Sequence, residues 1–103
     1  MNSPCVLTLV MAPELGGPFD DWFLEIYPDV GFTRAPVAGH SSQHEGLTLH
    51  EQVIGHRVRT QVQIVCERST GQDVVEQLRS EFPGANVHYW LVEVAEAGHL
   101  GEP

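Results

Sequence analysis

The strongest constraint on the fold is the alternating pattern of residues 57–67, which read RVRTQVQIVCE. One face of an extended chain would carry five mainly apolar residues: Val58, Thr60, Val62, Ile64 and Cys66. The other face would carry Arg59, Gln61 and Gln63. A period of two residues fits a β-strand and not a helix. Because one strand cannot bury its apolar face alone, the chain must supply further strands or helices to cover it.

Three other segments are expected to be strands. Residues 5–11 form a short apolar run that ends at Ala12-Pro13. Residues 31–39 look extended, and Pro36 places them at a sheet edge or a bulge because proline cannot donate to a ladder. Residues 87–95 are apolar on both faces, with Tyr89 and Leu91 on one side and Trp90, Val92 and Val94 on the other. A strand apolar on both faces suggests that a partner subunit covers one of them.

Two helices are expected between these strands. The first opens at Pro18 and stops before Pro28, because proline suits a first helical position. Its buried stripe would be Phe19, Trp22, Phe23 and Ile26. The second would start with Thr70 as N-cap and Asp73 as its capping-box partner, and would end at Pro83-Gly84. Its buried side would be Val74, Val75, Leu78 and Phe82.

The element order is therefore βαββαβ, which predicts a ferredoxin-like α+β sandwich. Two right-handed βαβ halves give a four-stranded antiparallel sheet with two helices on one face. We expect residues 1–103 to form a single domain, with a long loop at 39–56 and a tail at 98–103. The other sheet face would be open unless the protein oligomerises.

The charge balance limits the possible partners. The chain has 14 acidic residues against five arginines and no lysine, and its formal net charge is -9. Phosphate backbones and anionic membrane surfaces repel such a chain, so we expect no nucleic-acid binding. No apolar run reaches the roughly 18 residues of a membrane span, so we expect no membrane insertion. Two cysteines make no disulfide framework, and the N-terminus lacks the basic start of a signal peptide, which favours a cytoplasmic protein.

The predicted loop at residues 39–56 reads GHSSQHEGLTLHEQVIGH and holds four of the six histidines. Neutral imidazole with a carboxylate suits zinc, copper or nickel. The candidate ligands of such a divalent transition metal are His40, His44, Glu45 and His50. The spacing matches no strict metal signature, so a solvated polar loop or a different ligand is the favoured alternative.

Other residues have two readings each. Cys5 and Cys66 should lie close together, because the first and third strands of this fold are antiparallel neighbours. They would be either a soft-metal or redox pair, or two small buried hydrophobes. His88, Tyr89 and Trp90 would either stack on a planar ligand or pack at a subunit interface. No spacing joins a nucleophile to a base and an orienting group, which favours a protein that is not an enzyme.

Three segments together resemble a known family: GFTRAPVAGH, SSQHEGLTLHEQVIGHR and EFPGANVHYWLVEVAEAGHL. They are similar to the bacterial domain-of-unknown-function family 3240 of the PII-like superfamily, from about Leu7 to Leu100. More distant relatives are the PII nitrogen regulators and the CutA proteins of metal tolerance. The resemblance implies a homotrimer and a setting beside heavy-metal efflux pumps of the resistance-nodulation-division type.

The resemblance also implies a site. In PII-like trimers the loop between the second and third strands is the signalling loop, and ligands bind in clefts between subunits at its base. The corresponding cleft residues here would be Gly39, Arg34, Arg57, Pro83, Gly84 and His88. PII proteins that bind adenine nucleotides use lysines and arginines around the phosphates. This chain has no lysine, so arginines would have to replace them: Arg34, Arg57, Arg59 and Arg68. The hypotheses are a regulatory trimer sensing a metal, one binding a nucleotide or other anion, and a small enzyme.

Overall fold

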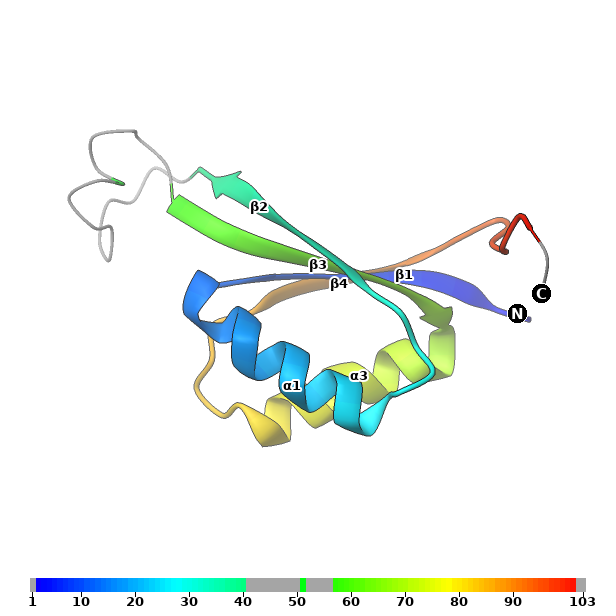
Figure 1. Cartoon of the computed structure of the whole chain (residues 1–103), viewed down its shortest axis with the longest axis horizontal. Coiled ribbons are helices and arrows are strands. Elements are labelled where there is room, and N and C mark those ends of the chain that lie inside the picture. Colours follow the sequence, from blue (N-terminus) through cyan, green and yellow to red (C-terminus); the bar gives the residue numbers. More distant parts are fainter. Residues whose placement is uncertain (1, 41–50, 52–56, 102–103) are drawn as a thin grey trace.

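The computed structural model describes residues 2–40, 51 and 57–101. The elements follow the chain as β1 (Pro4–Met11), the 3-10 helix η1 (Pro13–Leu15), α1 (Gly16–Ile26), β2 (Thr33–Gly39), β3 (Arg57–Glu67), α3 (Arg68–Glu81) and β4 (His88–Glu93). The strands form one antiparallel sheet in the order β2-β3-β1-β4. Both helices lie on the same face of that sheet (Figure 1). The predicted ferredoxin-like sandwich is confirmed.

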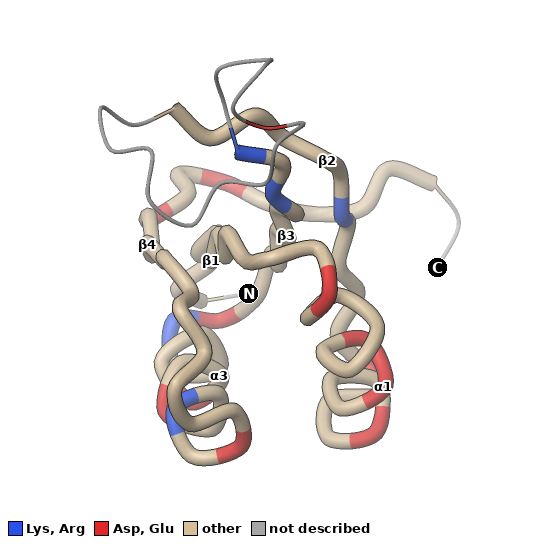
Figure 2. The backbone as a smooth tube through the Cα atoms, turned by 90° about the vertical axis from the view of Figure 1, so that its left-hand side faces the viewer, with Lys and Arg blue, Asp and Glu red and all other residues tan. Residues whose placement is uncertain are grey.

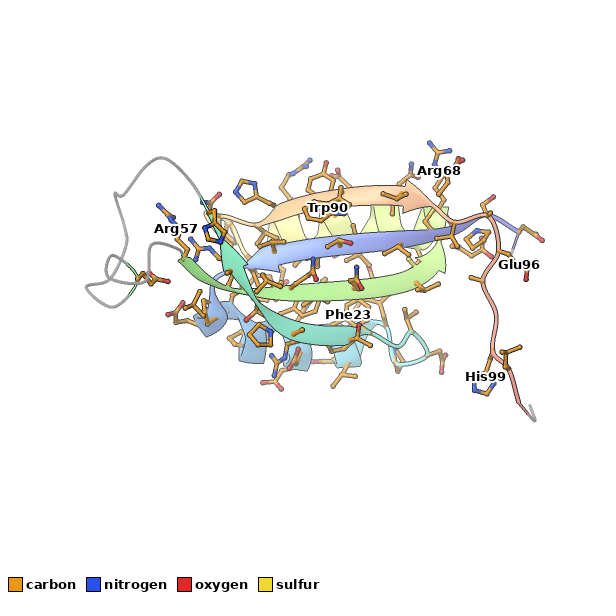
Figure 3. All side chains as sticks on the ribbon, turned by 90° about the horizontal axis from the view of Figure 1, so that it is seen from above. Phe23, Arg57, Arg68, Trp90, Glu96 and His99 are labelled. Atoms are coloured by element: carbon orange, nitrogen blue, oxygen red, sulfur yellow. The ribbon has the colours of Figure 1, made fainter. Side chains whose placement is uncertain are left out.

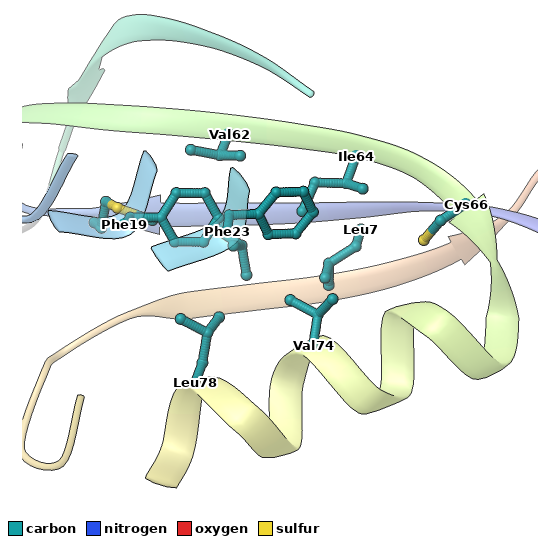
Figure 4. Packing of buried hydrophobic residues seen from close by; sticks show 10 residues of the cluster. Leu7, Phe19, Phe23, Val62, Ile64, Cys66, Val74 and Leu78 are labelled. Carbon is teal, nitrogen blue, oxygen red and sulfur yellow. The ribbon is translucent and has the colours of Figure 1, made fainter. Parts of the chain in front are cut away.

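The core lies between the sheet and the helices (Figure 4). The predicted alternation of residues 57–67 is confirmed at Val62, Ile64 and Cys66, which are all buried. β1 lies between β3 and β4 and contributes every second residue to the same layer: Cys5, Leu7, Leu9 and Met11. The helices close this layer with Phe19, Phe23, Val74 and Leu78.

Aromatic rings hold the helices together. The rings of Phe19 and Phe23 stack with centroids 5.4 Å apart, and Phe32, just before β2, meets Phe23 edge-on at 5.2 Å. Trp22 reaches Phe82 at the end of α3, at 5.8 Å. Offset and edge-on pairs of this kind are favourable arrangements for aromatic rings. The predicted stripe of α1 is thus confirmed except at its last residue, because Ile26 is 50% exposed.

The start of α3 differs from the sequence prediction. The helix begins at Arg68, directly after β3, and not behind Thr70. Glu67 is the N-cap, and no side chain caps the helix. Its carboxylate instead accepts hydrogen bonds of 2.9 Å from the backbone N–H groups of Asn2 and Ser3. The predicted capping box was therefore wrong, because the helix starts before Thr70 and its N-cap is Glu67.

Asp73, the other half of that predicted box, accepts a hydrogen bond of 2.5 Å from the Tyr27 hydroxyl. This contact joins the end of α1 to the first turns of α3. Burial raises the pKa of Tyr27 above its ordinary range, and the hydrogen bond to Asp73 and its negative charge raise it further. At its other end, α3 stops as predicted, with Gly84 at a φ of 83°, a conformation that favours glycine.

The second face of the sheet carries no helix (Figure 3). Val6 lies between Val65 and Val92 in the ladder, and Thr8 lies between Gln63 and Trp90. Three large apolar side chains of this open face are about half exposed: Val65 at 44%, Trp90 at 47% and Val92 at 53%. No described helix is long and apolar enough to cross a membrane.

We predict that Phe23→Ala lowers the free energy of unfolding by about 3–5 kcal/mol, because it leaves a cavity where four other rings meet. Urea denaturation followed by fluorescence measures the change. Leu24→Ala is the matched control in the same helix, since Leu24 is 56% exposed, and should cost about 0.5 kcal/mol or less. Equal losses in the two variants would contradict this core.

We predict that Tyr27→Phe costs about 0.5–1 kcal/mol at pH 7, because it removes the hydroxyl that binds Asp73. The pKa of Tyr27 is raised in the folded protein, so its contribution is present below the unfolded pKa of about 10 and is lost as pH rises above that value. The gap between wild type and variant in urea denaturation should therefore shrink above pH 10. A gap that stays constant to pH 11, or an equal cost for Tyr89→Phe, would argue against the bond.

Candidate functional site

The candidate site is the end of the sandwich from which the 39–56 segment leaves. Gly39 is the last residue of β2 and Arg57 is the first of β3, and the two are direct cross-strand partners. The end of β2 and the start of β3 therefore lie side by side at one end of the sheet (Figure 1). A site built by this segment is anchored on a rigid two-stranded base.

The predicted metal ligands fall mainly beyond this base. His40 directly follows β2 and is exposed. His44, Glu45 and His50 lie outside the described residues, so the predicted metal set stays a prediction. Within residues 2–40, 51 and 57–101, no group of three or more potential ligands is close enough to hold a metal ion.

Between His40 and Arg57, the structure describes Glu51, and this residue contacts the sheet. Its Oε2 accepts a hydrogen bond of 2.6 Å from the backbone N–H of Val58, the second residue of β3. This contact ties the segment to the base seven residues later in the chain. The sequence carries no signal for this contact, because nothing in the spacing indicates a backbone partner for Glu51.

Apart from Arg34, the predicted cleft residues lie at this end of the sandwich but on two different edges of the sheet. Gly39 belongs to β2, which is one outer strand. His88 opens β4, the other outer strand, and Pro83-Gly84 lie in the connection that precedes it. Three interstrand spacings, roughly 14 Å, separate the outer strands. One copy of the chain therefore does not bring Gly39 and Gly84 into a single cleft.

The predicted pair of arginines is also separated. Arg34 lies opposite Val62, five positions along β2 from the Gly39–Arg57 pair, which is roughly 17 Å. Its guanidinium is bound to Asp20 of α1 at 2.8 Å, so much of its charge is already compensated. Arg34 thus serves the contact between β2 and α1 in this copy.

Arg59 lies at the base of the 39–56 segment, beside Gly39. Its side chain packs against Gly39, where a Cβ would lie 3.4 Å from the Arg59 Cγ. It also lines an open hollow of about 380 Å³ with Ala85 and Asn86 of the α3–β4 connection. Arg34, Arg57 and Arg59 place three of the five arginines on β2 and β3, whereas α1 carries only acidic charges (Figure 2). Of these three arginines, Arg57 and Arg59 lie beside the 39–56 segment, so this acidic protein places two cations there.

A second hollow lies beside Gly84. It has a volume of about 150 Å³ between α3 and β4, and it is mostly apolar, with Leu78, Phe82 and Val87 among its walls. Arg79 and Tyr89 add polar groups. Because Arg79 is paired with Glu76 at 3.1 Å, the cavity offers no uncompensated charge.

The cysteine prediction is confirmed in its geometry. Cys5 and Cys66 are direct cross-strand partners on β1 and β3, and both are buried as free thiols. Burial raises the pKa of the Cys66 thiol, with smaller contributions from Cys5 and Glu67. The pair lies at the opposite end of β3 from Arg57.

Comparison with solved structures supports the fold. A DUF3240 family protein from Shewanella baltica superposes with a TM-score of 0.67 at 16% identity, covering 98% of this chain and 100% of the other. A putative PII-like signalling protein from Thermus thermophilus gives 0.62 at 17% identity, covering 89% and 87%. A functionally unknown protein from Pediococcus pentosaceus gives 0.64 at 10% identity, covering 94% and 97%.

The sequence comparisons are more limited. No curated protein matches this sequence. One family model, described as a protein of unknown function, DUF3240, matches residues 1–101, which is nearly the whole chain. The family predicted from the three sequence segments is therefore confirmed, and the chain belongs to the DUF3240 family.

Proposed function

We propose that this protein is a non-enzymatic PII-like regulator, which senses a ligand and signals through the 39–56 segment. The observation that carries this proposal is the pairing of Gly39 with Arg57. The whole segment is thereby attached at one point to a rigid sandwich, and Glu51 binds back to that point. A ligand that prefers one arrangement of such a segment shifts its population, and a partner protein can read the shift.

The proposed assembly is a homotrimer. The open sheet face exposes Val65, Trp90 and Val92 in one copy, and a patch of large apolar side chains is typical of an interaction surface. A trimer would also place the β2 edge of one copy beside the β4 edge of another. Gly39 and Gly84, which one copy keeps apart, could then border one cleft.

A regulatory role fits the chemistry of the described residues better than catalysis. Tyr27 and Cys66 are the described groups with a clearly displaced pKa, and each has a structural cause. Tyr27 bridges two helices, and Cys66 lies in the core. Tyr27 borders an open hollow with Ser69 and Thr70, but its hydroxyl is held by Asp73 and is not free to act as a catalytic acid or base.

The proposed ligand is a divalent transition metal, namely zinc, copper or nickel. His40, His44, Glu45 and His50 supply the imidazoles and the carboxylate that such ions prefer. A net charge of -9 also draws cations toward the protein. In this proposal the regulator works in the cytoplasm, and its partner is a component of a heavy-metal efflux system.

A second candidate ligand is an adenine nucleotide or another anion in a cleft between subunits. The observation that favours it is the position of Arg57 and Arg59 beside Gly39, in a chain with few other cations. Guanidinium groups bind phosphate oxygens in bidentate geometry. Arg34 is a weaker contact because it already binds Asp20.

We predict that the wild-type protein sediments as a trimer and that Val92→Asp converts it into a folded monomer. A carboxylate in the buried interface costs association free energy, whereas Val92 is 53% exposed in the single copy and tolerates the change there. Sedimentation velocity gives the mass, and circular dichroism checks the fold. Leu24→Asp, on the outer surface of α1, is the control and should leave the trimer intact. A monomeric wild type would refute the assembly.

We predict that isothermal titration calorimetry detects binding of zinc, copper or nickel to the wild type, and that the triple variant His40→Ala, His44→Ala, His50→Ala loses at least 100-fold in affinity. The variant removes three of the four proposed ligands. His99→Ala in the tail is the control and should bind normally.

A parallel thermal-shift series with ATP, ADP and AMP separates the two ligands, because a ligand of the native state raises the melting temperature. One decisive result is a nucleotide that raises the melting temperature of the wild type but not of Arg59→Ala, while no metal produces heat in calorimetry. That result would identify the ligand as an anion and not a metal. A protein that responds to neither class would contradict both versions.

A further inference from the structure

The two cysteines form a feature that the proposed function does not use. Cys5 is 1% exposed and Cys66 is 3% exposed, and they are direct partners across β1 and β3. Both point toward the helices, as do Leu7 and Ile64, the next pair on that face. Figure 4 shows Cys66 at the end of the core, beside the start of α3. Two thiols therefore occupy neighbouring cross-strand positions in the protein interior.

The hydrogen bonds of the ladder define the type of this pair. Antiparallel strands alternate between hydrogen-bonded and non-hydrogen-bonded pairs. The N–H of Arg68 donates to the carbonyl of Ser3 at 2.9 Å, which continues the register by one step beyond Pro4 and Glu67. Ser3 and Arg68 are thus a hydrogen-bonded pair, and the alternation makes the adjacent Pro4–Glu67 pair a non-hydrogen-bonded one. This position suits Pro4, which has no N–H to donate. The next pair, Cys5 and Cys66, is therefore of the hydrogen-bonded type.

This type of pair disfavours a direct bond between the sulfurs. Its Cβ atoms lie at the wide end of the range of about 4.5–5.5 Å found for cross-strand partners. A disulfide needs Cβ atoms about 3.5–4.5 Å apart. Two thiolates that bind one ion from opposite sides lie much further apart than the sulfurs of an S–S bond, which are about 2.05 Å apart. The wider Cβ spacing of this pair thus fits an intervening ion better than a disulfide.

We propose that Cys5 and Cys66 form a two-coordinate site for one soft monovalent ion, of which Cu(I) is the biological candidate. Thiolates are the ligands that select Cu(I). The described residues supply no third histidine, cysteine or carboxylate close enough to the pair to bind the same ion. The described part of the chain therefore does not form a tetrahedral zinc site here. On binding, two S–H bonds break, two S–Cu bonds form, and two protons go to solvent. Copper keeps its oxidation state, and the complex carries one negative charge.

The start of α3 compensates that charge. The helix begins two residues after Cys66, and Gly71 in its first turn lies over the thiol. A Cβ at Gly71 would lie only 3.6 Å from the Cys66 Sγ and 2.8 Å from a methyl group of Leu91. A larger residue would therefore fill the space beside the sulfur. The unpaired N–H groups of a first helical turn carry positive partial charge, which favours an anionic complex.

The Cys5 S–H group donates a weak hydrogen bond to the Ser3 carbonyl at 3.7 Å. A bound ion would replace this proton and that of Cys66. Without an ion, the two cysteines pack in the core as small apolar side chains.

A path to the site exists at the end of the sheet. A hollow of about 240 Å³ reaches Cys5 from the surface, between Ser3, Pro4 and Val94. Its rim carries the loose ion pair of Arg68 and Glu93, at 3.6 Å and well exposed. The site lies roughly 30 Å along β3 from Arg57, so it is independent of the 39–56 segment.

The test is an anaerobic titration of the full reduced chain with Cu(I), in competition with the chromophoric chelator bicinchoninate. We expect one Cu(I) per chain that survives competition. Cys5→Ser and Cys66→Ser should each weaken it at least 100-fold, while the triple histidine variant retains it. Ag(I), a redox-inert probe of the same preference, should raise the melting temperature of wild type but not of the cysteine variants.

X-ray absorption on the wild type tests the site even if a cysteine variant fails to fold. Two sulfur neighbours at one distance, and no nitrogen, would support it. Nitrogen ligands, equal retention of Cu(I) by the serine variants, or a lower melting temperature with Ag(I) would overturn it. Loss of Cu(I) only in the histidine variant would assign the ion to the 39–56 segment instead.

Discussion

The structure depends on β1, because it is the one strand that pairs with two strands distant in the sequence. Its register with β3 joins residues 49 to 63 positions apart, and its register with β4 joins residues up to 88 positions apart, from Cys5 to Glu93. Only with these ladders in place do Leu7 and Leu9 meet the aromatic rings of α1. The open face follows from the same arrangement, since both helices cross to one side and leave Trp90 and Val92 uncovered.

Much of this was predictable from local patterns. The alternation of residues 57–67 gave β3 its bounds, and the spacing of Phe19, Trp22 and Phe23 gave the buried side of α1. The predictions from local patterns failed where a residue distant in the sequence binds a side chain that was expected to bind nearby backbone. Thr70 and Asp73 have the spacing of a capping box, but Asp73 binds Tyr27 and the helix starts earlier. No local pattern contains such a partner.

The candidate site was less predictable for a geometric reason. Gly39, Arg57, Gly84 and His88 were expected in one cleft, and the sheet order places them on two edges. The closeness of Arg59 to Gly39 follows from register, which a sequence pattern does not fix beyond a strand's own faces. The cysteine pair was predictable, since it needed only the topology and the ends of two strands.

The join between β3 and α3 has a consequence for how this family can vary. Glu67 ends the strand and Arg68 begins the helix, so no spacer absorbs a change in chain length. One inserted residue there would turn α3 by about 100° about its axis and carry Val74 away from Leu7. Between Gly39 and Arg57 the same insertion leaves both anchoring residues in register. Related chains should therefore differ freely in length between β2 and β3, and scarcely at all between β3 and α3.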